Sequence, residues 1–127
     1  MKYRDYIAYN GMRYGDKLAV VDLSAGERYS HAELDALVSR LAALLRHACK
    51  ITAGERIAVL DRNGVNFLAL YYACARLGAI LVPLNWRLSA SELDYIVGDA
   101  APRLLLCGAD LLALARDVVA LQPQPPA

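Results

Sequence analysis

Short apolar runs alternate with helix-forming stretches through the second half of the chain. Residues 57–60 are apolar and include β-branched side chains, and a polar turn, Asp61–Gly64, follows them. Residues 65–77 contain no helix breaker and only one charged side chain, Arg76, so they predict a helix that is covered on more than one side. The pattern therefore indicates a buried strand followed by a crossover helix.

Two further apolar runs predict the partners of that strand. Gly78 suits the end of the preceding helix, since a glycine readily takes a left-handed backbone. Residues 79–82 are continuously apolar, which is typical of a parallel strand buried on both faces. Pro83 cannot donate to a strand ladder, so the strand should end there or lie at an edge. Residues 103–107 form the third apolar run, and strands joined by helices imply right-handed crossovers and a parallel sheet.

Helix starts are marked in two places by capping boxes, in which a serine and a glutamate three residues later cap one helix. Ser30 and Glu33 open a helix with one apolar stripe, and we expect this stripe to pack on the sheet, with partner binding as the alternative. The stripe consists of Leu34, Leu37, Val38, Leu41, Leu44 and Leu45. Ser89 and Glu92 open a second helix that should run to about Gly98.

The remaining segments complete the predicted fold. Residues 3–14 predict a short surface helix, residues 18–23 and 27–29 an antiparallel hairpin, and residues from Gly108 or Ala109 to Leu121 a last helix. The fold class that follows is α/β. It has three layers and a mainly parallel sheet with strands near 57–60, 79–82 and 103–107, helices on both faces, and the N-terminal hairpin.

Composition narrows the classes of protein that fit. The 127 residues are 57% apolar and carry a net charge of +1, with lysine and arginine scattered, so no nucleic-acid partner is indicated. Residues 1–5 lead into no apolar run, and no signal peptide is expected. Cys49, Cys74 and Cys107 are widely spaced and odd in number, which favours core packing over a metal site or a disulfide and fits a cytoplasmic protein.

A membrane span is the alternative interpretation of residues 67–84, which are largely apolar. Arg76 lies within this run, Gly78 interrupts it and Pro83 ends it. We therefore expect two buried elements of a sheet and no membrane span.

Few side chains are candidates for chemistry. His31 and His47 lie at opposite ends of one predicted helix, so they cannot meet, and His47 near a helix C-terminus suits the helix dipole. Asp94 and Asp99 lie on or near one helix without forming an obvious carboxylate pair.

Two predicted loops are candidates for binding. The turn Asp61–Gly64 follows a strand, and open α/β sheets bind ligands beyond the carboxyl ends of their strands. A plain turn is the simpler interpretation. Trp86 and Arg87 predict an exposed loop that fills an interface, with a stacked cation site as the alternative.

The segment from Asn63 to Leu88 resembles a stretch near the N-terminus of the AMP-forming acyl-CoA synthetases. Its core, Ala75-Arg76-Leu77-Gly78-Ala79-Ile80-Leu81-Val82-Pro83-Leu84-Asn85, is the most specific part. The similarity continues through residues 91–96 and 99–107, and residues 29–34 are similar to the start of the family's first long helix. In all, it covers about Lys17 to Leu121.

The resemblance implies a fold and an activity. These enzymes adenylate a carboxylic acid with ATP, accompanied by Mg²⁺, and transfer the acyl group to coenzyme A. Their large N-terminal domain is built from stacked sheets and helices, and a small mobile C-terminal domain closes the active site.

This sequence lacks the residues that perform the family's chemistry. The family's phosphate loop is a Ser/Thr/Gly-rich run ending in Pro-Lys-Gly, whereas this chain has one threonine, Thr52, and no lysine after Lys50. The acidic residue that holds the ribose and the C-terminal catalytic lysine are also missing. We therefore assign no catalytic, cofactor-binding or metal-binding residue.

The resulting expectation is an N-terminal fragment that does not turn over by itself. Residues 1–121 should form the N-terminal subdomain, and residues 122–127 a proline-rich tail that is extended or disordered. Its partner would be the rest of the synthetase or a second copy, through residues 109–121 or 65–77. The alternatives are a stand-alone interaction module and a small α/β nucleotide-binding protein.

Overall fold

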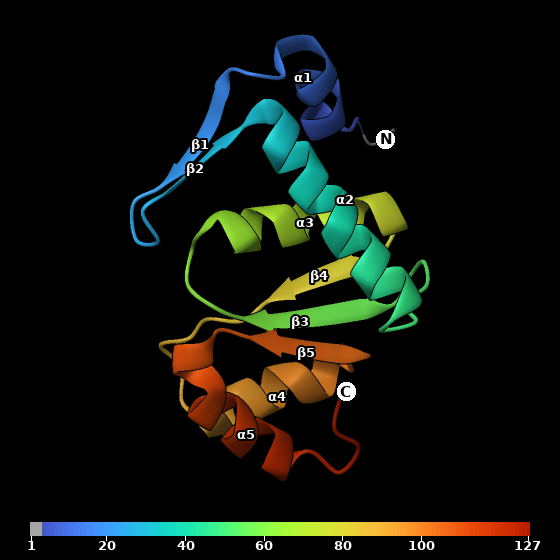
Figure 1. Ribbon diagram of the computed structural model, residues 1–127. Helices are drawn as coiled ribbons and strands as arrows, with labels where there is room; N and C mark the ends of the chain where they lie inside the picture. Colours follow the sequence, from blue (N-terminus) through green and yellow to red (C-terminus); the bar gives the residue numbers. More distant parts are fainter. Residues whose placement is uncertain (1–3) are drawn as a thin grey trace. The chain divides into compact units, whose positions relative to one another are not determined.

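The computed structural model describes residues 4–127, which form two compact units (Figure 1). Unit 1 comprises the described residues up to Lys50 together with Asn63–Gly78, and unit 2 comprises Ile51–Arg62 and Ala79–Ala127. The α/β class is confirmed, with a three-stranded parallel sheet flanked by helices and a separate antiparallel hairpin. Tyr3, where the first predicted helix was expected to begin, lies outside the described residues.

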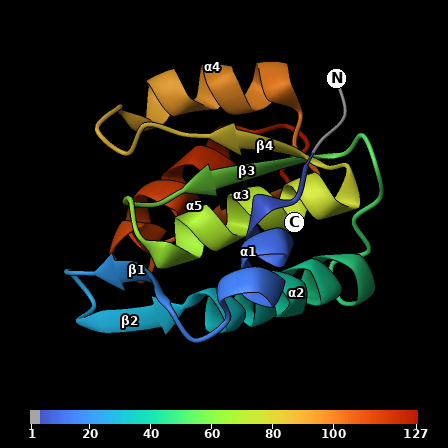
Figure 2. The ribbon, with the colours of Figure 1, turned by 90° about the horizontal axis from the view of Figure 1, so that it is seen from above.

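Unit 1 is a set of helices with the hairpin beside them. Helix α1 packs along α2, and α2 packs on α3, as Figure 2 shows for α1 and α2. The elements are α1 (Tyr6–Tyr14), β1 (Leu18–Asp22), β2 (Glu27–Ser30), α2 (His31–His47) and α3 (Val65–Leu77). The hairpin pairs antiparallel with an irregularity between Leu18 and Val20.

Helix α2 begins at the predicted capping box. The Glu33 amide donates to Ser30 Oγ at 3.2 Å, and the Ser30 amide donates to Glu33 Oε2 at 2.8 Å. The apolar stripe is narrower than predicted, because Leu44 is 54% exposed whereas Leu45 is buried. Consecutive residues of an α-helix point about 100° apart, so these two leucines cannot face the same side.

Helix α3 ends where the sequence predicts. Gly78 has φ 69° and ψ 18°, the left-handed geometry that a side chain would oppose. The broad apolar surface of α3 is partly covered, and Tyr71 stays 55% exposed. Its buried residues are Val65, Ala69, Leu70, Ala73, Cys74 and Leu77.

Unit 2 holds the parallel sheet in the order β4-β3-β5. The register places Ile57 of β3 opposite Leu81 of β4 and opposite Leu104 of β5. The elements are β3 (Arg56–Leu60), β4 (Ile80–Pro83), α4 (Ala90–Ala100), β5 (Leu104–Cys107), the 3-10 turn η1 (Ala109–Leu111) and α5 (Leu112–Leu121).

The expectation that residues 79–82 are buried on both faces is wrong. In the strand order of unit 2, β4 is an edge strand, and Ile80 is 51% exposed. The alternative raised by Pro83 is the one the structure adopts, since β4 lies at an edge and ends at that proline. The central strand is β3, of which Ile57 to Leu60 are all buried.

One face of the sheet forms the core of unit 2. Ala58 and Leu60 of β3 belong to one buried cluster with residues of α4 and α5, and Figure 1 shows these two helices beside the sheet. Helix α4 contributes Leu93 and Val97 to this core. It runs to Ala100, past the predicted end at Gly98, which is an exposed helical residue. The last predicted helix begins with η1 and continues as α5.

The proline-rich tail makes contacts at both of its ends. The Gln122 side-chain amide donates to the Asp94 carbonyl at 2.9 Å, and the Ala127 amide donates to the Arg103 carbonyl at 3.1 Å. The division into a subdomain of residues 1–121 and a tail of residues 122–127 stays a prediction.

Candidate functional site at the carboxyl ends of the strands

The carboxyl ends of the three parallel strands lie at the same end of the sheet. The Leu84 amide donates to the Val59 carbonyl at 2.8 Å, and the Gly108 amide donates to the Leu60 carbonyl at 3.0 Å. The loops after β4 and β5 therefore start level with the end of β3. Ligands of open α/β sheets bind beyond the carboxyl ends of the strands, so the candidate site lies there.

Side chains from the three loops are linked through Arg62, which contacts both Trp86 and Asp110. The Arg62 guanidinium carbon lies 4.0 Å from the Trp86 ring centroid, and that of Arg87 lies 4.4 Å from it. Arg62 Nε also donates to Asp110 Oδ2 at 2.8 Å, and this hydrogen bond is the main cause that lowers the pKa of Asp110. More than half of each side chain of this ion pair is exposed, so solvent screens it.

This Arg62–Trp86–Asp110 cluster, with Arg87, joins residues that the sequence analysis considered separately. Cation–π stacking of two guanidinium groups on one indole can hold loops together and also presents positive charge beside an aromatic ring. The pairing of Arg62 with Asp110 makes a brace between the β3 and β5 loops the simplest interpretation. Asp110 carried no signal in the sequence, because nothing local indicates its contact with Arg62.

The turn after β3 is held against the β5 loop. Asp61 Oδ1 accepts a hydrogen bond from the Arg62 amide at 2.7 Å. A Cβ atom at Gly108 would collide with that same Asp61 oxygen, so a side chain at position 108 would require the Asp61 carboxylate to move. The close approach explains why a glycine follows β5.

The other candidate residues are not brought together. His31 and His47 are the first and last residues of α2, so roughly 24 Å of helix separates them. Asp94 Oδ1 accepts from the Gln122 side chain at 2.5 Å and thus pairs with the tail rather than with Asp99.

The three cysteines are free, and Cys74 is buried. Burial raises the pKa of the Cys74 thiol to about 11, which disfavours a nucleophilic or metal-binding role. Among residues 4–127, no group of three or more histidine, cysteine, aspartate or glutamate side chains is placed to hold a metal ion. No helix in this part of the chain is long and apolar enough to cross a membrane.

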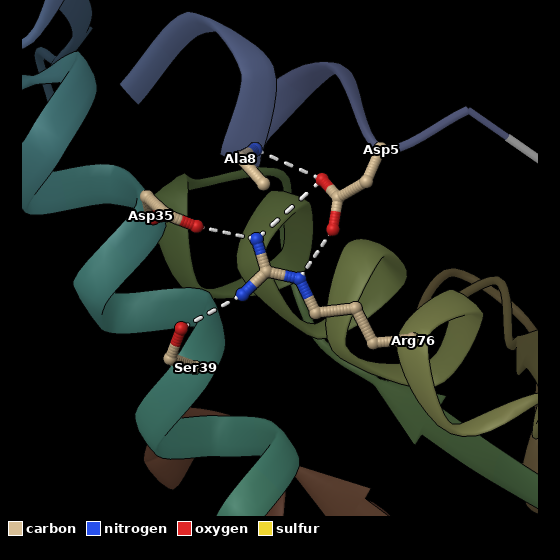
Figure 3. Close-up of polar contacts among 5 residues, drawn as sticks. All are labelled: Asp5, Ala8, Asp35, Ser39 and Arg76. Atoms are coloured by element: carbon tan, nitrogen blue, oxygen red, sulfur yellow. Dashed lines mark hydrogen bonds and ion pairs between the residues drawn. The ribbon is translucent and has the colours of Figure 1, made fainter. Parts of the chain in front are cut away.

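The strongest polar cluster lies in unit 1 and was missed in the sequence. Arg76 of α3 points toward α1 and α2, and its guanidinium bonds to two carboxylates and a hydroxyl (Figure 3). The partners are Asp5, Asp35 and Ser39. We name these four residues the Arg76 cluster. Asp5 also caps α1, because its Oδ1 accepts from the Ala8 amide at 2.9 Å. The cluster is a brace rather than a site, since all three guanidinium nitrogens of Arg76 bond to partners within unit 1.

The chain is similar in sequence to known proteins. A family model described as AMP-binding enzyme matches residues 7–126. The long-chain-fatty-acid–CoA ligase FadD13 of Mycobacterium tuberculosis is 37% identical over 108 residues, which are 85% of this chain and 21% of FadD13. The indoleacetate–CoA ligase of Aromatoleum aromaticum is 42% identical over 76 residues, or 60% of this chain and 15% of that ligase.

The chain is also similar in fold to a solved structure. The inhibitor-bound N-terminal domain of FACL13 from Mycobacterium tuberculosis superposes with a TM-score of 0.86 at 33% identity, over 94% of this chain and 30% of that domain. The chain thus spans about a fifth of the length of FadD13 and about a third of the FACL13 N-terminal domain. It belongs to the AMP-binding enzyme family and matches the N-terminal domain of that family's acyl-CoA synthetases.

Proposed function

We propose that this chain is the N-terminal portion of an AMP-forming acyl-CoA synthetase. Such an enzyme activates a carboxylic acid with ATP to an acyl-adenylate and transfers the acyl group to coenzyme A. The observation that carries the proposal is the family match over residues 7–126. The names of the relatives support it, since FadD13 is a long-chain-fatty-acid–CoA ligase and a second relative is an indoleacetate–CoA ligase.

The contribution of this chain would be structural. Its sequence holds no Ser/Thr/Gly-rich loop ending in Pro-Lys-Gly, so its own residues do not fit the phosphates of ATP. We therefore propose that ATP, Mg²⁺ and coenzyme A bind to the full-length enzyme, and that this chain alone does not turn over. In this proposal residues 1–121 are the N-terminal subdomain, and residues 122–127 lead to the rest of the synthetase.

The decisive experiment is a chimaera. Residues 7–126 of this chain replace the matched segment of FadD13, and acyl-CoA formation is measured with a panel of aliphatic and aromatic acids. The chimaera should form acyl-CoA, whereas FadD13 lacking the segment should not. ATP–pyrophosphate exchange by the 127-residue chain alone should stay at background. A folded but inactive chimaera, or robust exchange by the chain alone, would contradict the proposal.

The partner in this proposal is the remaining polypeptide of the synthetase, or a second copy when the chain is isolated. Leu112 and Leu121 of α5 are 43% and 53% exposed, which supports a covering partner on that helix. Light scattering over a dilution series should show a dimer at high concentration if a second copy takes this place. The three free cysteines favour a cytoplasmic location.

A further inference from the structure

Helix α1 carries large side chains on its exposed side. Tyr6, Tyr9 and Met12 are 54%, 51% and 89% exposed. These three residues and the exposed Arg13 lie along one side of the helix, since helical residues three, four or seven positions apart share a face. We name Tyr6, Tyr9, Met12 and Arg13 the α1 face. Its size and exposure make it a candidate surface for a partner.

The opposite side of α1 is held against α2. A Cβ atom at Gly11 would lie 3.0 Å from the Asp35 Cβ, so the two helices approach each other closely there. Asp5 caps the first turn of α1 and bonds to Arg76, which also bonds to Asp35. The α1 face therefore belongs to a fixed element, and little conformational entropy would be lost when a partner covers it.

The residue types of the α1 face are those of a protein interface. Tyrosine, methionine and arginine are enriched where proteins meet, and tyrosine and arginine are frequent among the residues that dominate binding. Arg13 Nη1 donates to the Tyr9 hydroxyl at 3.2 Å, and Arg13 Nε donates to the Tyr14 hydroxyl at 3.0 Å. Helices that lie in a membrane surface present tryptophan, phenylalanine or leucine instead of hydroxyl-bearing rings. A protein partner is therefore favoured.

The α1 face is complementary to itself. Tyr6 lies three residues before Tyr9, and Arg13 lies four residues after it. In two antiparallel helices related by a two-fold axis at Tyr9, Tyr6 would lie beside the partner's Arg13, and the same contact would occur again on the other side of the axis. A guanidinium group attracts the face of an aromatic ring, so both contacts would be favourable. Tyr9 would pack on its own counterpart.

A parallel pair of helices is less favourable. It would bring the two Arg13 side chains to the same level, so that like charges lie near each other, and it would separate each Arg13 from the ring of Tyr6 in the second copy. The antiparallel arrangement is the one in which the positive groups and the rings of the α1 face match.

We infer that the α1 face is an interface for a second copy of this chain, in which two α1 helices pack antiparallel about a two-fold axis at Tyr9. The inference goes beyond the proposed function, because it requires neither ATP nor an acid. It also differs from the placement of a second copy on α5, and single substitutions separate the two interfaces.

Sedimentation equilibrium of the 127-residue chain over a dilution series measures the association. We expect a monomer–dimer equilibrium. Tyr9→Glu should raise the dissociation constant of the dimer at least about tenfold, because it places two like charges at the axis. The matched control is Tyr95→Glu, since Tyr95 is a tyrosine of α4 that is 77% exposed. Leu121→Glu tests α5 in the same way, and circular dichroism shows whether each variant is folded.

Disulfides between two copies test the orientation of the helices. The background is Cys49→Ala with Cys107→Ala, which removes the two half-buried thiols. Tyr9→Cys should form a disulfide with its own counterpart in a glutathione buffer. When Tyr6→Cys and Arg13→Cys chains are mixed in equal amounts, the mixed disulfide should exceed each symmetric one at least about fivefold, because only the mixed pair is close. Mass spectrometry distinguishes the three products.

A chain that stays monomeric at every concentration would overturn the inference, as would a dimer that Tyr9→Glu leaves unchanged or that Tyr95→Glu weakens equally. A dimer that only Leu121→Glu disrupts would assign the interface to α5. Equal yields of the mixed and symmetric disulfides would contradict the antiparallel arrangement. Sedimentation with vesicles of phosphatidylcholine and phosphatidylglycerol tests the other occupant: a monomer that binds them through Tyr9 would assign the α1 face to a lipid surface and would also overturn the inference.

Discussion

Arg76 Nε lies 2.6 Å from Asp5 Oδ2, although 71 positions of sequence separate the two residues. The same guanidinium donates to Asp35 Oδ1 at 2.5 Å and to Ser39 Oγ at 2.8 Å. The Arg76 side chain is only 17% exposed, so most of its charge is neutralised by these partners rather than by water. The single charge of α3 thereby ties α1 and α2 to that helix (Figure 3).

Removing this charge should destabilise the protein measurably. We expect Arg76→Met to lower the free energy of unfolding by about 1–3 kcal/mol, because Asp5 and Asp35 stay partly buried and lose their ion-pair partner. The loss should appear as a lower urea midpoint with an unchanged m-value. The urea midpoint of Arg76→Lys should lie between those of the wild type and Arg76→Met, since an ammonium group keeps the charge but cannot bridge several acceptors as a guanidinium does.

The matched control for this loss is Arg46→Met. Arg46 is an exposed residue in the last turn of α2, and its replacement should change stability by less than about 0.5 kcal/mol. Equal effects of the two methionine substitutions would show that the Arg76 cluster adds nothing beyond an ordinary surface charge.

The stability that Asp5 contributes should depend on pH. Burial raises the pKa of Asp5, but hydrogen bonds from Arg76 and the Ala8 amide outweigh it and lower the pKa below the ordinary 3.8. A pKa that is lower in the folded state stabilises the protein above the unfolded value, and this contribution is lost as the pH falls through the folded value. The stability gap between wild type and Asp5→Asn should therefore be full at neutral pH and should shrink below about pH 4. Urea titrations across this range measure the gap, and a constant gap would contradict the role of the carboxylate.

The local signals of the sequence predicted the boundaries of elements well. Both capping serines, Ser30 and Ser89, make the bonds expected of them, and Gly78 has the left-handed backbone of a helix end. These features depend on groups within a few residues of one another, so a short window of sequence contains them. The partners of Arg76 could not be predicted in this way, because they depend on how three helices pack.

The candidate site was also predictable only in part, because its loops are local features but the contacts between them are not. The turn after β3 and the Trp86–Arg87 loop were each recognisable from their position after a predicted strand. Their meeting depends on the strand order β4-β3-β5, which places the β4 and β5 loops on either side of the β3 turn. That order is a property of the folded sheet, and no hydrophobic period specifies it. The same order explains the exposure of Ile80, since an apolar run looks alike in a central strand and in an edge strand.

The close approach of Gly108 to Asp61 predicts an effect of a single methyl group. Gly108→Ala should lower the free energy of unfolding by about 0.5–1.5 kcal/mol, because the new Cβ displaces the Asp61 carboxylate from the Arg62 amide. The double variant Asp61→Ala, Gly108→Ala should lose less than the sum of the two single variants. Chemical denaturation of the four proteins gives this coupling, and strictly additive losses would mean that the two residues do not compete for one space.

A gain in stability is expected at the end of α4. Ala101 has φ 45°, a left-handed backbone that costs an L-residue roughly 1–2 kcal/mol, and its carbonyl accepts from the Arg56 guanidinium at 3.2 Å. Ala101→Gly should raise the free energy of unfolding by about 0.5–1 kcal/mol, since the relief of strain exceeds the extra entropy that glycine loses on folding. Ala100→Gly, one position earlier in the helix, should instead lower it by a similar amount of about 0.5–1 kcal/mol. Changes of opposite sign in the free energy of unfolding, measured by urea denaturation, would identify backbone strain at Ala101. Two decreases of equal size would show that alanine at position 101 causes no strain.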